Sequence, residues 1–187
     1  HESQSLIWEN IICRSQEFWE FAYPEYARTL NLDPNCNSDD FYRYINRVEP
    51  SLIRVDADET TYFMHIVIRF ELEQALFSGV LEVKDLPDAW NKKYKAALGI
   101  TPPDYTHGVL QDVHWSAGLI GYFPTYGIGL ILAAQLWDSI QKELGEAKVK
   151  EQIRNGNFVS ILGWLDKKIH KRACLVDTKT LLRYVTR

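Results

Sequence analysis

The sequence predicts a mainly α-helical protein with a sizeable core. Apolar residues recur at three- and four-residue intervals along most of the chain, as one buried helix face requires. Residues that favour helix starts, such as Asp58 and Asp177, precede several of these segments. The chain has 187 residues, of which 46% are hydrophobic and 13% aromatic, so it can bury a sizeable core and is not disordered. We expect a single helical unit over residues 1–187, without internal repeats or linkers.

The N-terminal region predicts two helices. The first runs from Ser5 to Phe21, where apolar residues alternate with charged ones at helical spacing. The second lies within residues 37–48, "NSDDFYRYINRV". We expect Ser38 to be its N-cap, with Asp39 and Asp40 near the positive end of the helix dipole.

The long apolar segment from Asp58 to Phe77 is the hardest to assign. Its β-branched run "HIVIRF" suggests a strand. The length of the segment and the flanking "ELEQAL" favour a helix instead, with Glu59 in its first turn.

The remaining helices follow clear start and stop signals. Asp85 is expected to cap a helix that has Pro87 in its first turn and runs to about Leu98. The next segment, "GITPPDYTHG", is a loop. Further helices are expected at Pro124–Gly145, Glu146–Arg154 and Phe158–Lys168, and a last one begins after Asp177.

A stretch without any charge lies between His114 and Asp138. By length it could span a bilayer. Its glycines, its proline and its central tyrosines argue against a span, and no basic cluster flanks it. We therefore expect no membrane span, and a buried wall of the protein instead.

Charge and cysteine content restrict the partners and the compartment. The formal net charge is -4 and no basic stripe with interleaved aromatics occurs, so nucleic acid is not an expected partner. The three cysteines lack motif spacing, which favours free thiols and a cytoplasmic location.

The chain opens with "HES", which places two possible metal ligands, His1 and Glu2, side by side. Neighbouring residues on a helix point about 100° apart, so the two would not easily bind the same ion. Either one of them is a metal ligand, or both are ordinary polar residues at a helix start.

A second candidate is Arg54 in "LIRVDADET". An arginine among apolar neighbours, held by Asp56 and Asp58, could grip a carboxylate with two parallel hydrogen bonds. The alternative is a surface loop in which Asp58 caps the next helix.

A third candidate is "THGVLQDVHW", which gathers His107, Gln111, Asp112, His114 and Trp115. A histidine beside an uncharged, tyrosine-bearing wall could donate a hydrogen bond to developing negative charge, with Gln111 and Asp112 orienting it. The alternative is a polar turn that leads into a core helix. No serine nucleophile elbow or phosphate-binding glycine loop is present.

Four ordered motifs, "HESQ", "IRVDAD", "GVLQDVHW" and "GYFPTYGIG", resemble the C-terminal part of the carboxypeptidase Taq family of HExxH-type zinc metallocarboxypeptidases. The resemblance covers essentially the whole chain and implies the multi-helix C-terminal portion of that metallopeptidase fold. The sequence contains no HExxH motif, so the resemblance implies a C-terminal fragment that is inactive without the upstream segment. The implied reaction is attack of a zinc-activated water on the last peptide bond, with the absent HExxH glutamate as general base.

The resemblance also implies roles for individual residues. Glu2 would be a zinc ligand, with His1 and Gln4 close around the site. Arg54 would clamp the substrate's free carboxylate and Tyr126 would hydrogen-bond the same end. His114 would steady the tetrahedral intermediate, with Gln111 and Asp112 shaping its loop. The implied partners are a peptide with a free C-terminus, the missing N-terminal part and a second copy in a homodimer.

A different class of function remains open. The chain could be a helical interaction or scaffold domain that has kept these motifs without the chemistry. A third possibility, a membrane-anchored helical protein, rests only on the uncharged stretch.

Overall fold

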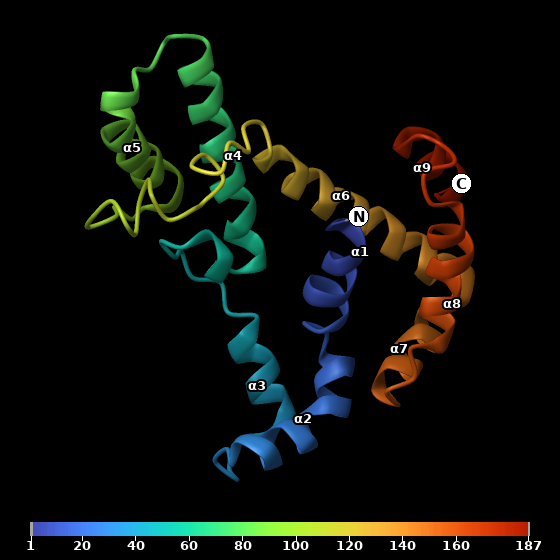
Figure 1. The fold of residues 1–187 in the computed structure, drawn as a ribbon. Helices are drawn as coiled ribbons and strands as arrows, with labels where there is room; N and C mark the ends of the chain where they lie inside the picture. The colour runs from blue at the N-terminus through green and yellow to red at the C-terminus, as the bar shows by residue number, and fades with distance from the viewer. Residues whose placement is uncertain (1, 187) are drawn as a thin grey trace. The chain divides into compact units, whose positions relative to one another are not determined.

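The structure, a computed structural model, describes residues 2–186 and confirms the mainly helical prediction (Figure 1). Over these residues it contains nine α-helices and no β-strand. The helices are α1 (Glu2–Leu6), α2 (Gln16–Leu30), α3 (Ser38–Ile45), α4 (Glu59–Phe77), α5 (Leu86–Leu98), α6 (Phe123–Leu144), α7 (Glu146–Arg154), α8 (Val159–Lys168) and α9 (Thr178–Val185). Four short helical segments accompany them: η1 (Ile7–Ile12), which is π-helical, and the 3-10 helices η2 (Arg54–Asp56), η3 (Val83–Asp85) and η4 (His170–Arg172).

The chain divides into two compact units, each with its own core. Unit 1 is formed by the described residues of His1–Ile45 and Gly129–Arg187, and unit 2 is Asn46–Ile128. The sequence did not indicate this division, and the expectation of a single helical unit over residues 1–187 stays a prediction.

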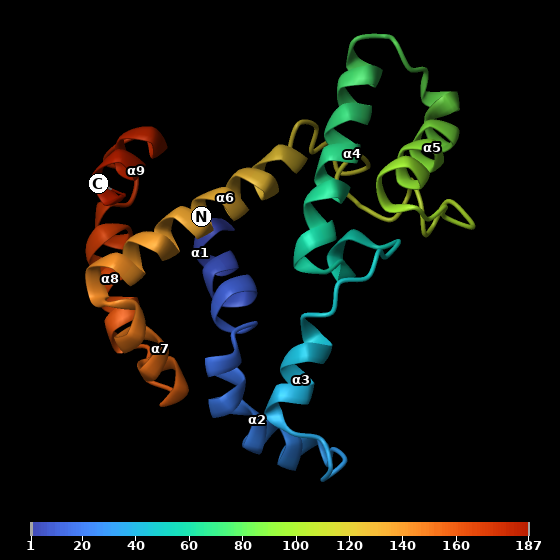
Figure 2. The ribbon, with the colours of Figure 1, turned by 180° about the vertical axis from the view of Figure 1, so that it is seen from behind.

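Unit 1 packs around side chains that are completely removed from solvent. Its core joins η1, α6, α7 and α8 through Ile7, Ile12, Ile140, Val149 and Ile161, each 0% exposed. Helices α2 and α3 lie side by side, as Figures 1 and 2 both show.

Two expectations about the N-terminal helices were wrong in detail. The predicted Ser5–Phe21 helix is interrupted: after η1 the chain turns, and Ser15 takes an extended conformation and starts α2. Its hydroxyl accepts a hydrogen bond from the Phe18 amide at 3.2 Å, and this capping interaction competes with continuation of the helix. The cap of α3 is Asn37 rather than Ser38, because the Asn37 side-chain oxygen accepts hydrogen bonds from the next two aspartate amides.

Unit 2 is built on α4 and α5, which pack side by side (Figure 1). Asp58 caps α4 as expected, accepting from the Thr60 and Thr61 amides at 2.9 Å. The helix prediction for the "HIVIRF" segment is also confirmed. Helix α5 begins after Asp85, but the Asp85 side chain makes no capping hydrogen bond, so that part of the prediction was wrong.

A row of polar side chains is buried along α4. Thr61, His65, Arg69 and Glu73 follow at intervals of four residues and are at most 9% exposed. Such spacing places them on one helix face. Buried polar and charged groups are costly unless they are hydrogen-bonded. The partners of this row, described below, therefore determine whether the core of unit 2 is stable.

The uncharged stretch is only partly a buried wall. Phe123 and Leu136 are buried, but Ile120, Ile128 and Ile131 are about half exposed. Within the described part of the chain, no helix is long and apolar enough to cross a membrane.

We predict an acid-sensitive contribution of His65 to stability. Its burial, together with the charges of Arg69 and Arg54, lowers the pKa of His65 from 6.5 to about 4. The unfolded chain therefore binds more protons than the folded chain between pH 6.5 and 4. The contribution is complete above pH 6.5 and is lost as the pH falls toward 4, by about 3 kcal/mol.

Denaturant unfolding at pH 7 and pH 4.5 measures this effect. His65→Asn removes the titration but keeps a polar atom toward the Tyr94 hydroxyl, which lies 2.9 Å from His65 Nδ1. The stability of this variant should depend less steeply on pH over this range. An equally steep dependence would assign the acid sensitivity to other groups.

We also predict that Gly156→Ala destabilises unit 1. Gly156 has φ +64°, and a Cβ there would lie 2.3 Å from Cε2 of Phe21. The expected loss is about 1–3 kcal/mol more than for Gly99→Ala, because Gly99 has a similar φ of +75° but open space around it. Thermal or denaturant unfolding of the two variants gives the comparison. Phe21→Ala should relieve part of the loss in Gly156→Ala, and no relief would show that the ring contact is not its cause.

Candidate active site

The candidate site begins at η2, just before α4 in unit 2. Asp58 anchors this segment twice: one carboxylate oxygen caps α4 and the other accepts from the Glu49 amide at 3.1 Å. Burial on its own would raise the pKa of Asp58, but its hydrogen bonds with Thr61, Glu49 and Thr60 outweigh that effect and lower it. The carboxylate is therefore ionised at neutral pH and fixes the segment that carries Arg54.

Arg54 is held in one orientation by several partners. Its Nε lies 3.2 Å from both oxygens of Asp112, and its Nη2 donates to Asp112 Oδ1 at 2.8 Å. Nη1 donates to the Tyr62 hydroxyl at 2.9 Å, and the Tyr126 ring lies over the guanidinium, 4.9 Å from Cζ to the ring centre. A guanidinium has five N–H donors. These bonds to described residues use Nε and one N–H of each terminal nitrogen, so one N–H on Nη1 and one on Nη2 are left.

A second arginine shares the same carboxylate. Arg69, on the buried polar row of α4, donates from Nε to Asp112 Oδ2 at 2.6 Å. Burial would raise the pKa of Asp112, but the hydrogen bond of Arg54 and the charges of Arg69 and Arg54 outweigh it and lower the pKa. Asp112 is therefore ionised at neutral pH and bridges two guanidinium groups.

Gln111 fixes the same two arginines through neutral hydrogen bonds. Its side-chain oxygen accepts from the Arg54 amide at 2.9 Å and from Arg69 Nη2 at 2.8 Å. Its side-chain nitrogen donates to the carbonyl oxygens of Leu52 and His107. Gln111 thus joins the loop after α5 to the segment before α4.

His114 and Tyr126 form a second pair beside this cluster. His114 is 7% exposed, and its Nε2 lies 3.0 Å from the Tyr126 hydroxyl. Burial lowers the pKa of His114, and the positive charges of Arg54 and Arg69 act in the same direction against the opposing charge of Asp112. The imidazole is therefore neutral at pH 7 and can exchange one hydrogen bond with the tyrosine.

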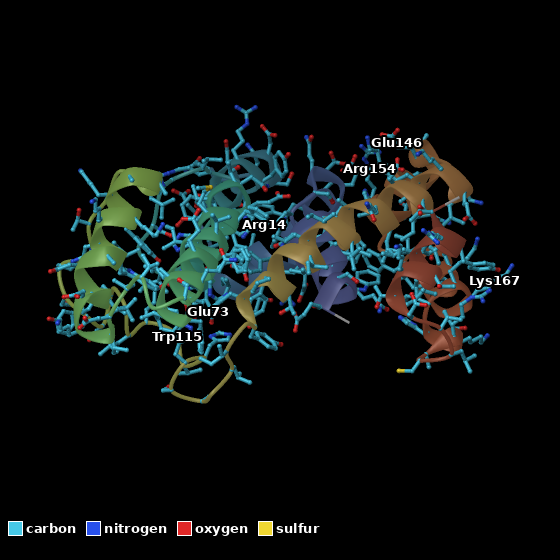
Figure 3. All side chains as sticks on the ribbon, turned by 90° about the horizontal axis from the view of Figure 1, so that it is seen from above. Arg14, Glu73, Trp115, Glu146, Arg154 and Lys167 are labelled. Atoms are coloured by element: carbon cyan, nitrogen blue, oxygen red, sulfur yellow. The ribbon has the colours of Figure 1, made fainter. Side chains whose placement is uncertain are left out.

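The loop between His114 and Tyr126 is fixed from α4 by Glu73. Glu73 Oε1 accepts from the Trp115 indole at 2.7 Å, and Oε2 accepts from the Gly121 amide at 3.1 Å. Figure 3 labels Glu73 and Trp115 where these side chains meet. One buried carboxylate thus anchors the loop close to both His114 and Tyr126.

Several sequence-based assignments need correction. Gln111 and Asp112 orient Arg54 rather than His114, because His114 Nδ1 lies 3.8 Å from Asp112, beyond hydrogen-bond distance. Asp112, 58 residues away in sequence, holds Arg54 in place of the expected Asp56 and Asp58. His107 is exposed and bonds Asp104.

The sequence analysis missed Arg69 and Glu73. The signal that could have identified them is the four-residue spacing of polar residues within an apolar helix, which is unusual unless the residues have buried partners.

Two further predicted site residues, Glu2 and Gln4, belong to unit 1. Glu2 is half-buried at the start of α1, and no described residue forms a hydrogen bond or ion pair with its carboxylate. Gln4 contacts His170 through its side-chain oxygen. His1 lies outside the described residues. Among residues 2–186 no group of three metal-binding side chains occurs.

Comparison with known proteins supports the resemblance expected from the motifs. The sequence model described as carboxypeptidase Taq (M32) metallopeptidase matches residues 1–187. Thermostable carboxypeptidase 1 of Thermus thermophilus is 45% identical over 186 residues, which is 100% of this chain and 36% of the relative. Carboxypeptidase 1 of Bacillus subtilis is 46% identical over 174 residues, 91% of this chain and 34% of the relative.

Solved structures of carboxypeptidases are also similar to this chain. Metallocarboxypeptidase 1 of Trypanosoma cruzi matches with a TM-score of 0.94 and 42% identity, covering 100% of this chain and 39% of that one. The M32 carboxypeptidase of Deinococcus radiodurans matches with a TM-score of 0.93 and 36% identity, covering 100% of this chain and 37% of that one. The chain spans little more than a third of these proteins. It belongs to the carboxypeptidase Taq (M32) family of metallopeptidases.

Proposed function

We propose that this chain is the C-terminal portion of a metallocarboxypeptidase that removes the last residue from peptides. Its part in the reaction would be to bind the free carboxylate of the substrate and to supply one metal ligand. The observation that carries this proposal is the hydrogen bonding of the Arg54 guanidinium. Asp112 and Tyr62 fix its guanidinium, yet one N–H on each terminal nitrogen is left for a ligand.

The two N–H groups suit a carboxylate. A carboxylate can accept two parallel hydrogen bonds from the terminal nitrogens of an arginine, and such charge-assisted pairs are strong. Tyr126 lies against the same guanidinium and carries a hydroxyl that also contacts His114. In the proposed complex Tyr126 donates to the carboxylate, and His114 hydrogen-bonds the oxygen that becomes negative during hydrolysis.

Glu2 is the proposed metal ligand of this chain. It fits that role because its half-buried carboxylate is uncommitted to any other described residue. His1 and Gln4 would surround the ion, and the remaining ligands would lie on the upstream HExxH segment of the longer protein. We propose zinc, which accepts carboxylate and imidazole ligands. When bound, the ion would supply Lewis acidity for peptide hydrolysis.

The proposed protein is longer than this chain, homodimeric and cytoplasmic. The relatives' greater length supports the first point, since each is covered by only about a third. The three free thiols, Cys13, Cys36 and Cys174, support a reducing compartment. The homodimer rests on the family resemblance.

A non-catalytic interaction domain is the second candidate. The observation that favours it is the burial of Arg54, which is only 5% exposed and already pairs with Asp112. In that case Arg54 would have a purely structural role. The experiments on Arg54 described next distinguish the two functions.

We predict that Arg54→Ala in the longer protein lowers kcat/KM by about thirty-fold to several thousand-fold. Truncating one partner of a partly buried charge pair costs about 2–5 kcal/mol, and each 1.4 kcal/mol is about tenfold in rate. Arg54→Lys should restore little, because an ammonium group cannot reproduce the planar fork. Steady-state kinetics on a peptide with a free C-terminus gives the values. Arg47→Ala is the matched control, since Arg47 is exposed and pairs only with a surface glutamate.

Amidating the substrate separates recognition from stability. The amide lacks the carboxylate, so wild type and Arg54→Ala should differ much less on amidated peptide than on free acid. If Arg54 has only a structural role, the variant is less stable but keeps the wild-type ratio of the two rates. An unchanged ratio would show that Arg54 does not bind the carboxylate, and absence of hydrolysis by the wild-type protein would support the interaction-domain alternative.

We predict that residues 1–187 alone bind zinc weakly. A catalytic zinc site usually has three protein ligands, and the described residues supply no such group. In the longer protein, Glu2→Gln should weaken zinc binding by at least about a hundredfold, while Glu9→Gln should leave it unchanged. Calorimetric titration measures both. Tight stoichiometric zinc binding by residues 1–187 would contradict the assignment of Glu2.

A further inference from the structure

Two arginines of unit 2 contact Asp112, but only one of them has donors to spare. Arg69 uses Nε for Asp112, Nη2 for Gln111, and Nη1 for both the His65 carbonyl and the Tyr94 hydroxyl. These bonds occupy four of its five N–H donors. Its side chain is 0% exposed, with Trp90 and Phe123 rings 4.6 and 5.4 Å from Cζ. Arg69 therefore has almost nothing to offer a ligand.

Two of the partners of Arg69, Asp112 and Gln111, also contact Arg54. Asp112 Oδ2 bonds Arg69 while Asp112 Oδ1 bonds Arg54. Gln111 accepts from Arg69 Nη2 and from the Arg54 amide through the same oxygen. Asp112 and Gln111, two of the residues that hold Arg54, are thus also bonded to one fixed residue on α4.

The hydrogen-bonded cluster also carries an excess positive charge. Two guanidinium groups share the single carboxylate of Asp112, and Gln111 is neutral. The other buried carboxylates nearby, Glu73 and Asp58, are held by neutral N–H donors and form a hydrogen bond with neither guanidinium. A single Arg54–Asp112 pair would be neutral and would attract an anion weakly. The second arginine leaves one positive charge that an incoming carboxylate can balance.

We infer that Arg69 is a positioning residue for recognition of the substrate's terminal carboxylate. It holds Asp112 and Gln111 so that Arg54 directs its two remaining N–H groups to the ligand. Its positive charge also offsets the negative charge of Asp112, so that the charge of Arg54 is available to the ligand. This inference rests on the proposed function of Arg54.

Competitive inhibition of the longer, metal-loaded protein tests the inference. The probes are an N-benzoyl amino acid and the same compound as its C-terminal amide. The ratio of their inhibition constants measures discrimination for the carboxylate and does not depend on the fraction of active enzyme. Arg69→Lys keeps the charge but loses the fork that reaches Asp112 and Gln111 together. It should reduce the discrimination by about 10- to 100-fold.

A double-mutant cycle tests whether Arg69 affects carboxylate discrimination through Arg54. Arg54→Ala should remove most of the discrimination, and Arg54→Ala with Arg69→Lys should remove no more, because Arg69 acts through Arg54. Arg154→Lys, an exposed arginine of unit 1, is the matched control and should keep the wild-type ratio. If Arg69 is only a part of the core, Arg69→Lys changes stability but not the ratio. That result would overturn the inference while leaving the role of Arg54 intact.

A milder variant covers the case in which Arg69→Lys does not fold. Tyr94→Phe deletes the hydroxyl that accepts from Arg69 Nη1 but keeps the ring stacked on Trp90, 5.0 Å between centres. The discrimination should fall several-fold, again with no further fall beside Arg54→Ala. A wild-type ratio in Tyr94→Phe would overturn the inference. If Arg54→Ala itself keeps the wild-type ratio, the proposed function fails instead.

Discussion

The candidate site of unit 2 depends on the ion pairs that Asp112, 12% exposed, forms with two arginines. The shortest contacts of Asp112 are from Arg54 Nη2 to Oδ1 at 2.8 Å and from Arg69 Nε to Oδ2 at 2.6 Å. Removing one partner of a buried ion pair typically costs about 3–5 kcal/mol, because the remaining charge is left without compensation. Here the loss would strand two guanidinium groups, one of them completely buried. The cluster therefore links the loop after α5 to α4 and to the segment before it.

Helix α4 supports the site through its polar face rather than its apolar one. Asp58 at its start fixes the Arg54 segment, Arg69 in its middle holds Asp112, and Glu73 near its end anchors the loop that follows His114. A rigid helix places these three anchors at fixed separations, about 1.5 Å per residue along its axis. The candidate binding residues lie in η2, in the loop after α5 and in the first turn of α6, and the anchors on α4 hold these segments in place. Groups that make a site precise are often those that never touch the ligand.

The sequence predicted helices better than it predicted contacts. Start signals at Asp58 and Asp177, and the period of the apolar residues, are local and were read correctly. The break at Ser15 was missed because apolar periodicity continues through it, while the capping hydrogen bond that ends the helix is invisible in a hydrophobic pattern. The motifs around Arg54 and His114 identified the candidate residues. The pairing of Arg54 with Asp112 spans 58 positions, and no local rule specifies which carboxylate an arginine meets across such a separation.

The division of the chain into units also separates two kinds of chemistry. Arg54, Asp112, His114 and Tyr126 all belong to unit 2, and the hydrogen bonds described for them come from residues of the same unit. Glu2 belongs to unit 1, where its carboxylate has no partner among the described residues. The charged groups of this cluster thus find their hydrogen-bond partners within unit 2, where Asp112 is shared by two guanidinium groups. The proposed metal ligand, in contrast, is one donor of a set that needs more. Under the proposed function, recognition of the peptide's end would rest on residues of unit 2, whereas a metal ion would need ligands in addition to Glu2.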